Sequence, residues 1–197
     1  MNTALRILVF AGSARRESFN RRLARVAVQQ IAATGARATL LELADHPLPL
    51  YDGDLEAASG LPEQALKLKE VFIAHDAFVV VSPEYNSSIP ALLKNTLDWV
   101  SRPLPQQSGY VPFSGKAAAL MSASPGNLGG LRGLRHLRDV LTELQMIVLP
   151  KQVSLPAAHQ AFDSEDQLTD PSTARRMGEL VGELLGMAAR LRGQPET

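Results

Sequence analysis

The stretch LRILVFAGSARRESFNRRLA, residues 5–24, decides how this chain folds. It begins with a nearly continuous apolar run, Leu5–Ala11, which stops at Gly12. Polar residues follow, and a segment with helical spacing of apolar residues begins near Asn20. An apolar run without alternation is typical of a parallel strand that is buried on both faces. The stretch therefore predicts a strand, a polar loop and a helix.

The same order of strand and helix continues along the chain. Further strands are predicted at Ala38–Leu43, Ala77–Ser82 and Ala117–Ser122, and a fifth near Met146–Leu149 that Pro150 would stop. Helices are predicted at Arg21–Thr34, Glu63–His75, Ile89–Val100, Leu131–Glu143 and Ser172–Leu191. Strands that alternate with helices predict right-handed crossovers and a parallel sheet with helices on both faces.

Length and composition indicate one folded domain over residues 1–197, with a disordered tail after about residue 192. Hydrophobic residues make up 45% of the chain and charged residues 20%, as in globular proteins. Lys+Arg and Asp+Glu both number 20, so the formal net charge is zero. This balance gives no indication of a nucleic-acid partner or of an anionic membrane surface.

The chain contains no cysteine, which excludes disulfides, thiolate nucleophiles, iron–sulfur clusters and cysteine zinc sites. Its four histidines show no metal-ligand spacing, so we expect no metal. No signal peptide is evident, and no run of roughly 20 apolar residues is long enough to span a bilayer. These features predict a cytoplasmic protein.

Polar loops follow three of the predicted strands. They are GSARRESFN (12–20), PEYNSSIP (83–90) and SASPGNLGG (122–130). In an open α/β sheet, ligands bind beyond the carboxyl ends of the strands, where the strand order reverses. We therefore expect the three loops to meet and to form a ligand site.

The first loop offers donors that suit a phosphate: the hydroxyls of Ser13 and Ser18, the amide of Asn20 and the guanidinium of Arg15. The following helix adds free N–H groups and the positive end of its dipole. The loop matches neither the P-loop nor the dinucleotide glycine motif. An alternative is a plain N-capped helix, with Ser18 or Asn20 as its cap.

The second loop places prolines, an acid, an aromatic ring and an amide directly after a buried strand. Its backbone groups and Tyr85 suit the edge of a planar heterocycle, although a turn with Ser88 as a helix cap would have a similar sequence. In the third loop, Gly126, Gly129 and Gly130 would permit close approach of the backbone to a ligand. A flexible loop without a ligand would have the same composition.

Together these loops resemble the NADPH-dependent FMN reductase family, which includes bacterial chromate and quinone reductases. The matching pieces are GSARRESFNRRLA (12–24), SPEYNSSIPALLKNTLDWVSRP (82–103) and, more loosely, SASPGNLGGLRGLRHLR (122–138). The resemblance covers roughly residues 5–155. It implies a flavodoxin-like, doubly wound sheet of five parallel strands in the order 2-1-3-4-5, with FMN held non-covalently at the strand ends.

The resemblance also implies roles for individual residues. Those that would hold the FMN phosphate are Ser13, Arg15, Ser18 and Asn20. Those that would line the isoalloxazine ring, largely through backbone groups, are Pro83, Glu84, Tyr85 and Asn86. Those that would form the wall on the other side are Ser122, Ser124 and Gly126. The family often has an aromatic residue after the second-loop asparagine, where this chain has Ser87.

The implied activity is that of an FMN-dependent NAD(P)H oxidoreductase with a ping-pong cycle. NAD(P)H would reduce the bound FMN and leave, and a small acceptor would then take two electrons: a quinone, chromate, an azo or nitro compound, or free flavin. No side chain is expected to act as a nucleophile or general acid. The resemblance also implies a homodimer or homotetramer. Two alternatives are a flavodoxin-type electron carrier and a non-catalytic module that binds another phosphate ligand.

The segment after the third loop carries four basic residues, Arg132, Arg135, His136 and Arg138. They would meet the 2′-phosphate of NADPH or an acidic patch of a partner subunit, or they would form a solvated helix face. The sequence leaves these three interpretations open.

Overall fold

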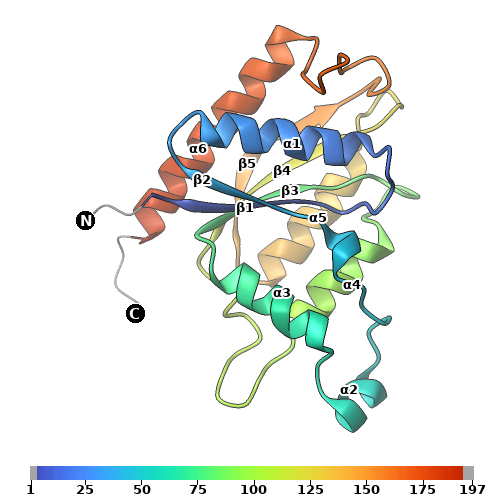
Figure 1. Ribbon diagram of the computed structural model, residues 1–197, viewed down its shortest axis with the longest axis vertical. Coiled ribbons are helices and arrows are strands. Elements are labelled where there is room, and N and C mark those ends of the chain that lie inside the picture. The colour runs from blue at the N-terminus through green and yellow to red at the C-terminus, as the bar shows by residue number, and fades with distance from the viewer. Residues whose placement is uncertain (1–3, 193–197) are drawn as a thin grey trace.

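The strands of the computed structural model, which describes residues 4–192, form one parallel sheet in the order β2-β1-β3-β4-β5 (Figure 1). The strands are β1 (Arg6–Ala11), β2 (Arg37–Leu41), β3 (Ala77–Val81), β4 (Ala117–Ala123) and β5 (Ile147–Leu155). The helices are α1 (Phe19–Ala32), α2 (Gly53–Ser59), α3 (Glu63–Ile73), α4 (Ala91–Val100), α5 (Leu131–Glu143) and α6 (Pro171–Arg192). The predicted flavodoxin-like order is confirmed.

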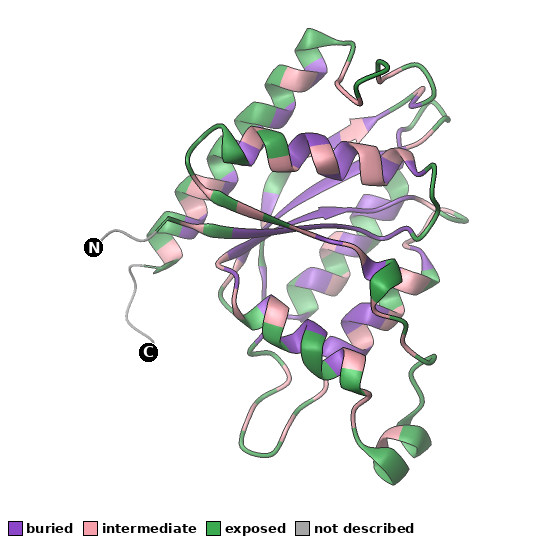
Figure 2. Cartoon of the chain, viewed as in Figure 1, coloured by how far each residue is buried: buried purple, intermediate pink, exposed green. Residues whose placement is uncertain are grey.

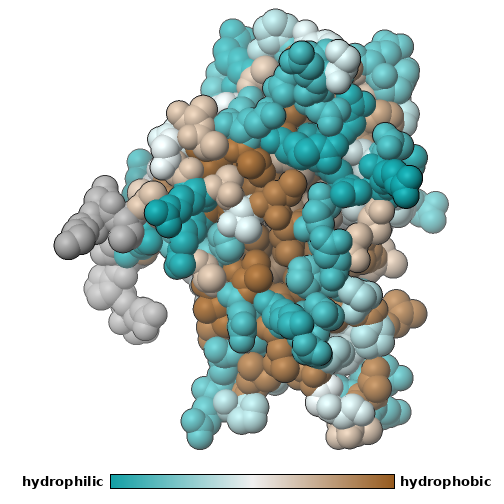
Figure 3. All heavy atoms as spheres, viewed as in Figure 1, coloured by the Kyte–Doolittle hydropathy of each residue, from teal (hydrophilic) through white to brown (hydrophobic). Residues whose placement is uncertain are grey.

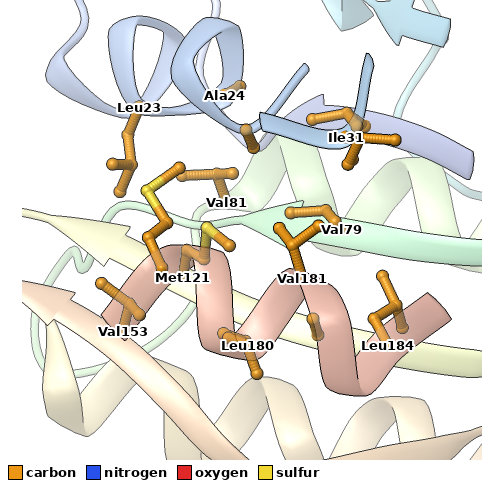
Figure 4. Close-up of a cluster of buried hydrophobic side chains, with 14 of the residues drawn as sticks. Leu23, Ala24, Ile31, Val79, Val81, Met121, Val153, Leu180, Val181 and Leu184 are labelled. Carbon is orange, nitrogen blue, oxygen red and sulfur yellow. The ribbon is translucent and has the colours of Figure 1, made fainter. Parts of the chain in front are cut away.

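Two apolar clusters lie on the two faces of the sheet. Helices α1 and α6 cover one face, and α3, α4 and α5 cover the other (Figure 1). In Figure 4, Val79, Val81 and Met121 of the sheet lie between side chains of α1 and α6. The second cluster is rich in aromatic rings, with Phe10 and Phe72 packed at 5.3 Å between ring centres.

Burial on both faces explains why the apolar runs in the sequence are continuous. All residues of β3 and β4 are buried, and Figure 2 shows the inner strands in the colour of buried residues. Strand β2 lies at the edge of the sheet and alternates between exposed and partly buried positions until Leu41. Figure 3 shows apolar residues gathered over the middle of the side of the molecule that it draws, where the edge strand β2 lies.

The prediction that Pro150 stops the fifth strand is wrong. Strand β5 continues to Leu155, and its pairing with β4 shifts register between Ala118 and Leu120. A proline is tolerated at a bulge on an edge strand, because no ladder bond needs its missing N–H. The guanidinium of Arg138 donates hydrogen bonds to the carbonyls of Val148 (3.3 Å), Leu149 (2.7 Å) and Pro150 (3.4 Å), so the freed acceptors are satisfied.

One helix was not predicted. Helix α2 lies in the loop after β2, and Asp52 caps it by accepting hydrogen bonds from the N–H groups of Asp54 and Leu55. None of its residues is buried, and it projects from the body in Figure 1. Contacts from its flanks hold it in place: Trp99 Nε1 donates to the carbonyl of Pro49 at 2.8 Å.

Residues 4–192 include no helix long and apolar enough to cross a membrane and no cluster of three or more potential metal ligands. The predicted disorder after residue 192 falls on residues outside the described part of the chain.

Candidate functional site

The three polar loops meet at the carboxyl ends of β1, β3 and β4, where they enclose a small pocket of about 70 Å³. Its lining comprises Ser13, Arg15, Ser18, Phe19, Asn20, Pro83, Glu84, Tyr85, Ala123, Ser124 and Pro125. Eight of these are predicted site residues. The predicted residues Asn86, Ser122 and Gly126 do not line the pocket, and Phe19, Ala123 and Pro125 were not predicted.

The first loop leaves β1 under tight packing constraints. The N–H of Gly12 donates to the carbonyl of Val81 at 2.9 Å, which extends the pairing of β1 with β3. A Cβ at Gly12 would lie 3.0 Å from Cβ of Leu93, so glycine is needed here for contact with α4. The φ of Gly12 is not positive, so close packing and not a left-handed turn explains the glycine.

Hydrogen-bond donors of the first loop converge on the pocket. Ser18 is the N-cap of α1 and accepts from the N–H of Arg21 at 3.4 Å, so the capping alternative is confirmed. Its hydroxyl proton remains able to donate, because one hydroxyl can accept and donate at once. Within residues 4–192 the N–H groups of Phe19 and Asn20 have no acceptor, as expected for the first turn of a helix. Capping and anion binding are therefore compatible at this helix end.

Asn20 connects the first loop to the third. Its Nδ2 donates to the carbonyl of Ala123 at 2.8 Å, and its Oδ1 accepts from the N–H of the same residue at 2.9 Å. Both residues are buried. One Nδ2 proton remains for a ligand, but the main action of this side chain is to hold two loops together.

The second loop turns sharply at Asn86 and Ser87, whose φ values are 50° and 64°. Tyr85 and Ser88 exchange both backbone hydrogen bonds at 3.0 Å, so the two residues between them form a two-residue hairpin turn. Left-handed backbone at both central positions is the type I′ geometry, which favours asparagine. Asn86 is thus explained by the turn, and Ser88 lies in this turn rather than capping α4, whose N-cap is Pro90.

Glu84 connects the second loop to α5. Its Oε2 accepts from the N–H groups of Arg132 (2.9 Å) and Gly133 (3.0 Å), and its Oε1 accepts from Nε of Arg132 at 2.8 Å. Burial raises the pKa of Glu84, but the N–H of Gly133 and the guanidinium of Arg132 outweigh it, so the net pKa is lowered. The carboxylate stays ionised and fixes the loop, which leaves the backbone of the loop available to a ligand.

Gly133 permits this connection, since a Cβ there would lie 3.1 Å from the carbonyl oxygen of Ser88. The sequence contains no local signal for the Glu84–Arg132 contact, which spans 48 residues.

The third loop contains two glycines that the fold requires. The φ of Gly130 is 85°, and a Cβ there would lie 1.8 Å from Oγ of Ser122. That hydroxyl is buried and has no hydrogen-bond partner within residues 4–192, so Ser122 lies beneath Gly130 and not in the pocket wall. Gly129 has a φ of 58° and lies against the backbone of Leu155. A Cβ at Gly126 would meet only Ser124 Oγ at 3.7 Å, so nothing in the structure demands glycine there.

The chemistry of this donor set fits a phosphate joined to a planar ring. Buried hydroxyls, unpaired N–H groups and the exposed guanidinium of Arg15 lie on the α1 side of the pocket. Residues of the second and third loops form its other walls. A phosphate at the N-terminus of α1 would satisfy donors that have no partner among the described residues.

Comparisons with known proteins identify the family of this chain. Residues 5–160 match the family model for NADPH-dependent FMN reductase. The chain is 36% identical to NAD(P)H-dependent FMN reductase PA1204 of Pseudomonas aeruginosa over 195 residues, which cover 98% of this chain and all of that protein. It is 38% identical to a quinone reductase of Escherichia coli K12 over 151 residues, 77% of each chain.

Among solved structures, FerB, a flavoenzyme NAD(P)H:(acceptor) oxidoreductase from Paracoccus denitrificans, superposes with a TM-score of 0.80. The two are 29% identical, and the match covers 95% of this chain and 98% of FerB. The chain belongs to the NADPH-dependent FMN reductase family and is an NAD(P)H-dependent oxidoreductase whose cofactor is FMN.

Proposed function

We propose that this enzyme transfers electrons from NAD(P)H to a small quinone-type acceptor in a ping-pong order, through FMN bound in the pocket between the three loops. The observation that carries the proposal is the convergence of unpaired N–H groups, buried hydroxyls and Arg15 beside the N-terminus of α1. When bound, FMN supplies the hydride-accepting and electron-donating chemistry. The chain binds it, orients it and excludes water from one side.

Residues of the first loop would hold the phosphate. The hydroxyls of Ser13 and Ser18 are nearly fully buried, so an anion that accepts from them is shielded from solvent. Arg15 adds a charge-assisted contact from the exposed side. Asn20 keeps the third loop at a fixed separation from this phosphate site.

Residues of the second and third loops would border the ring. Pro83 to Tyr85 form one wall, and Ala123 to Pro125 form the other. Because the carboxylate of Glu84 is committed to α5, its backbone and not its side chain would face the ring. Asn86, Ser122 and Gly126 would support these walls without touching FMN, which is a narrower role than the sequence predicted.

We also propose that the enzyme works in the cytoplasm as a homodimer or homotetramer. Apolar side chains exposed near α2 and the loop before β4 support an interface: Leu50 is 77% exposed, Val111 40% and Tyr110 39%. Phe113 of the same loop is fully buried within the chain and does not contribute. Light scattering coupled to size-exclusion chromatography tests this proposal, and a single-copy mass would refute it.

The main test combines flavin binding with anaerobic reduction. Arg15→Ala, and separately Ser13→Ala with Ser18→Ala, should weaken FMN binding by about 10- to 100-fold, since a charge-assisted hydrogen bond contributes about 1.5–3 kcal/mol. Arg16→Ala is the matched control, because Arg16 is an exposed neighbour that does not line the pocket. FMN dissociation is followed by fluorescence quenching.

In the parent protein, the flavin absorbance should bleach on addition of NADPH or NADH without air and return on addition of a quinone. Unchanged FMN affinity in the Arg15 variant would refute the phosphate assignment. Bound flavin that neither nucleotide reduces would refute the proposed reaction.

A further inference from the structure

The structure separates the four basic residues of α5 into different roles. Arg138 donates to carbonyls of β5. His136 Nδ1 lies 3.0 Å from Oγ of Ser88 in the second loop. Arg132 pairs with Glu84, and Arg135 is exposed with no hydrogen bond or ion pair to any residue from 4 to 192. Only Arg132 contacts a residue that lines the pocket and remains open to solvent.

The pair Arg132–Glu84 is asymmetric in exposure. The side chain of Glu84 is 9% exposed, whereas that of Arg132 is 55% exposed. A guanidinium has five N–H donors, and Arg132 directs its Nε and Nη2 groups at one oxygen of Glu84. The outer edge of the guanidinium therefore faces solvent with donors to spare, while the inner edge is held at the pocket rim.

The rim of the pocket is electropositive although the chain as a whole is neutral. Its charged groups are Arg15 and Glu84, which line the pocket, and Arg132, which pairs with Glu84. Two cations and one carboxylate therefore lie at this rim, against a formal net charge of zero for the chain. A ligand that carries more negative charge is favoured at such a rim.

NADPH differs from NADH only in the 2′-phosphate on its adenosine ribose. This group is a phosphate monoester, and such a group carries a charge near −2 at neutral pH. A planar guanidinium that is fixed on one edge and free on the other suits a bidentate contact with a phosphate. Fixing by Glu84 also lowers the conformational entropy that the arginine loses when it binds.

We propose that Arg132 recognises the 2′-phosphate of NADPH and determines preference for NADPH over NADH, with Glu84 as its positioning residue. The inference rests on the proposed function, because it requires the nucleotide to bind over the pocket between the three loops. It assigns no such role to Arg135, which has no positioning partner in the described part of the chain.

The test compares Arg132→Ala and Arg132→Lys with Arg135→Ala, an exposed arginine one helical turn further along α5. Steady-state kcat/KM is measured with NADPH and with NADH at a fixed quinone concentration. Arg132→Ala should lower kcat/KM for NADPH by about 10- to 100-fold and change that for NADH by less than about 3-fold. Arg132→Lys should lose part of the NADPH value, and Arg135→Ala should alter neither by more than about 3-fold.

A second readout does not depend on turnover. Calorimetric titration with adenosine 2′,5′-bisphosphate, with adenosine 5′-monophosphate as the comparison ligand, should show an affinity loss of about tenfold for the bisphosphate alone in Arg132→Ala. Arg132→Ala leaves the carboxylate of Glu84 without its guanidinium partner, and this negative charge could itself repel the bisphosphate. The double variant Glu84→Gln with Arg132→Ala removes that charge. It should retain the loss for the bisphosphate.

Three outcomes would overturn the inference: equal losses for NADPH and NADH, an equal effect of Arg135→Ala, or recovery of the NADPH preference in the double variant. Oxidation of neither nucleotide by the parent protein would instead refute the proposed function. If the parent protein oxidises neither nucleotide, the titration with the bisphosphate still tests whether Arg132 binds the 2′-phosphate, because it does not require turnover.

Discussion

Replacing Asn20 by alanine should disconnect the first loop from the third. The Asn20 side chain makes hydrogen bonds of 2.8 and 2.9 Å with the carbonyl and the N–H of Ala123, and both residues are buried. In Asn20→Ala these two backbone groups keep their buried position and lose the one side-chain partner that they have within residues 4–192. The variant tests whether this contact organises the site.

The expected cost follows from the number of groups left unpaired. Each unsatisfied buried donor or acceptor costs about 1–3 kcal/mol, so the two groups together cost about 2–6 kcal/mol. Domains are stable by only about 5–15 kcal/mol, so the loss is a large fraction of the total. FMN affinity should fall by at least about tenfold as well, because the third loop is no longer held opposite the phosphate donors.

Urea unfolding of the apoprotein measures the first effect, and FMN titration measures the second. Asn127→Ala is the control, since Asn127 is an exposed asparagine of the third loop with no hydrogen bond inside the described chain. Its free energy of unfolding should change by less than about 0.5 kcal/mol. A change below about 1 kcal/mol in Asn20→Ala, together with parental FMN affinity, would refute the reasoning.

Three further variants test other features. Gly130→Ala should lower the free energy of unfolding by at least about 2 kcal/mol, because its Cβ would lie 1.8 Å from Ser122 Oγ at a φ of 85°. When Ser122→Gly is added, urea unfolding should show that part of this free energy is recovered. No recovery would contradict the assigned clash. Burial lowers the pKa of His75 below that of the unfolded chain, so its contribution to stability is complete above about pH 6.5 and is lost as the pH falls further. Unfolding measured between pH 7.5 and 5 should therefore depend less on pH in His75→Gln, and equal slopes would refute the assignment. Burial lowers the pKa of Lys116 from 10.5 to about 8. Between these pH values the unfolded chain binds more protons than the folded chain, so the free energy of unfolding rises with pH across that window. Lys116→Met should flatten this rise, and an unchanged rise would contradict the role assigned to Lys116.

The fold could be predicted largely from sequence because the inner strands are buried on both faces. Such strands produce continuous apolar runs, and those at Leu5–Ala11, Ala77–Ser82 and Ala117–Ser122 all correspond to strands of the structure. Strand β5 was cut short in the prediction because its bulge and its contacts with Arg138 depend on tertiary structure. Helix α2 was missed since it has no buried face and thus no apolar period.

The site could be predicted as three loops but not as a set of contacts. Residue types in a loop indicate which donors it offers, and eight of the predicted residues do line the pocket. Residue types do not show which of these donors already form hydrogen bonds to other residues of the protein. The contacts of Asn20 with Ala123 and of Glu84 with Arg132 join residues 103 and 48 positions apart, so no local pattern reports them. The sequence predicted that Ser122 lines the pocket, but Ser122 lies buried under Gly130. That position depends on the left-handed backbone of Gly130, which the sequence pattern does not report.

The bulge at Pro150 also protects the free edge of the sheet. A long, flat edge strand offers a row of unpaired N–H and C=O groups to which another chain can add a strand, and this is a common route to aggregation. Strand β5 forms such an edge, but Pro150 removes a donor, the shifted register interrupts the ladder, and Arg138 occupies three successive acceptors. Lys151, the next residue of this edge strand, has an exposed charged side chain that pairs with Glu183 of α6. The proline therefore keeps β5 from templating further strands.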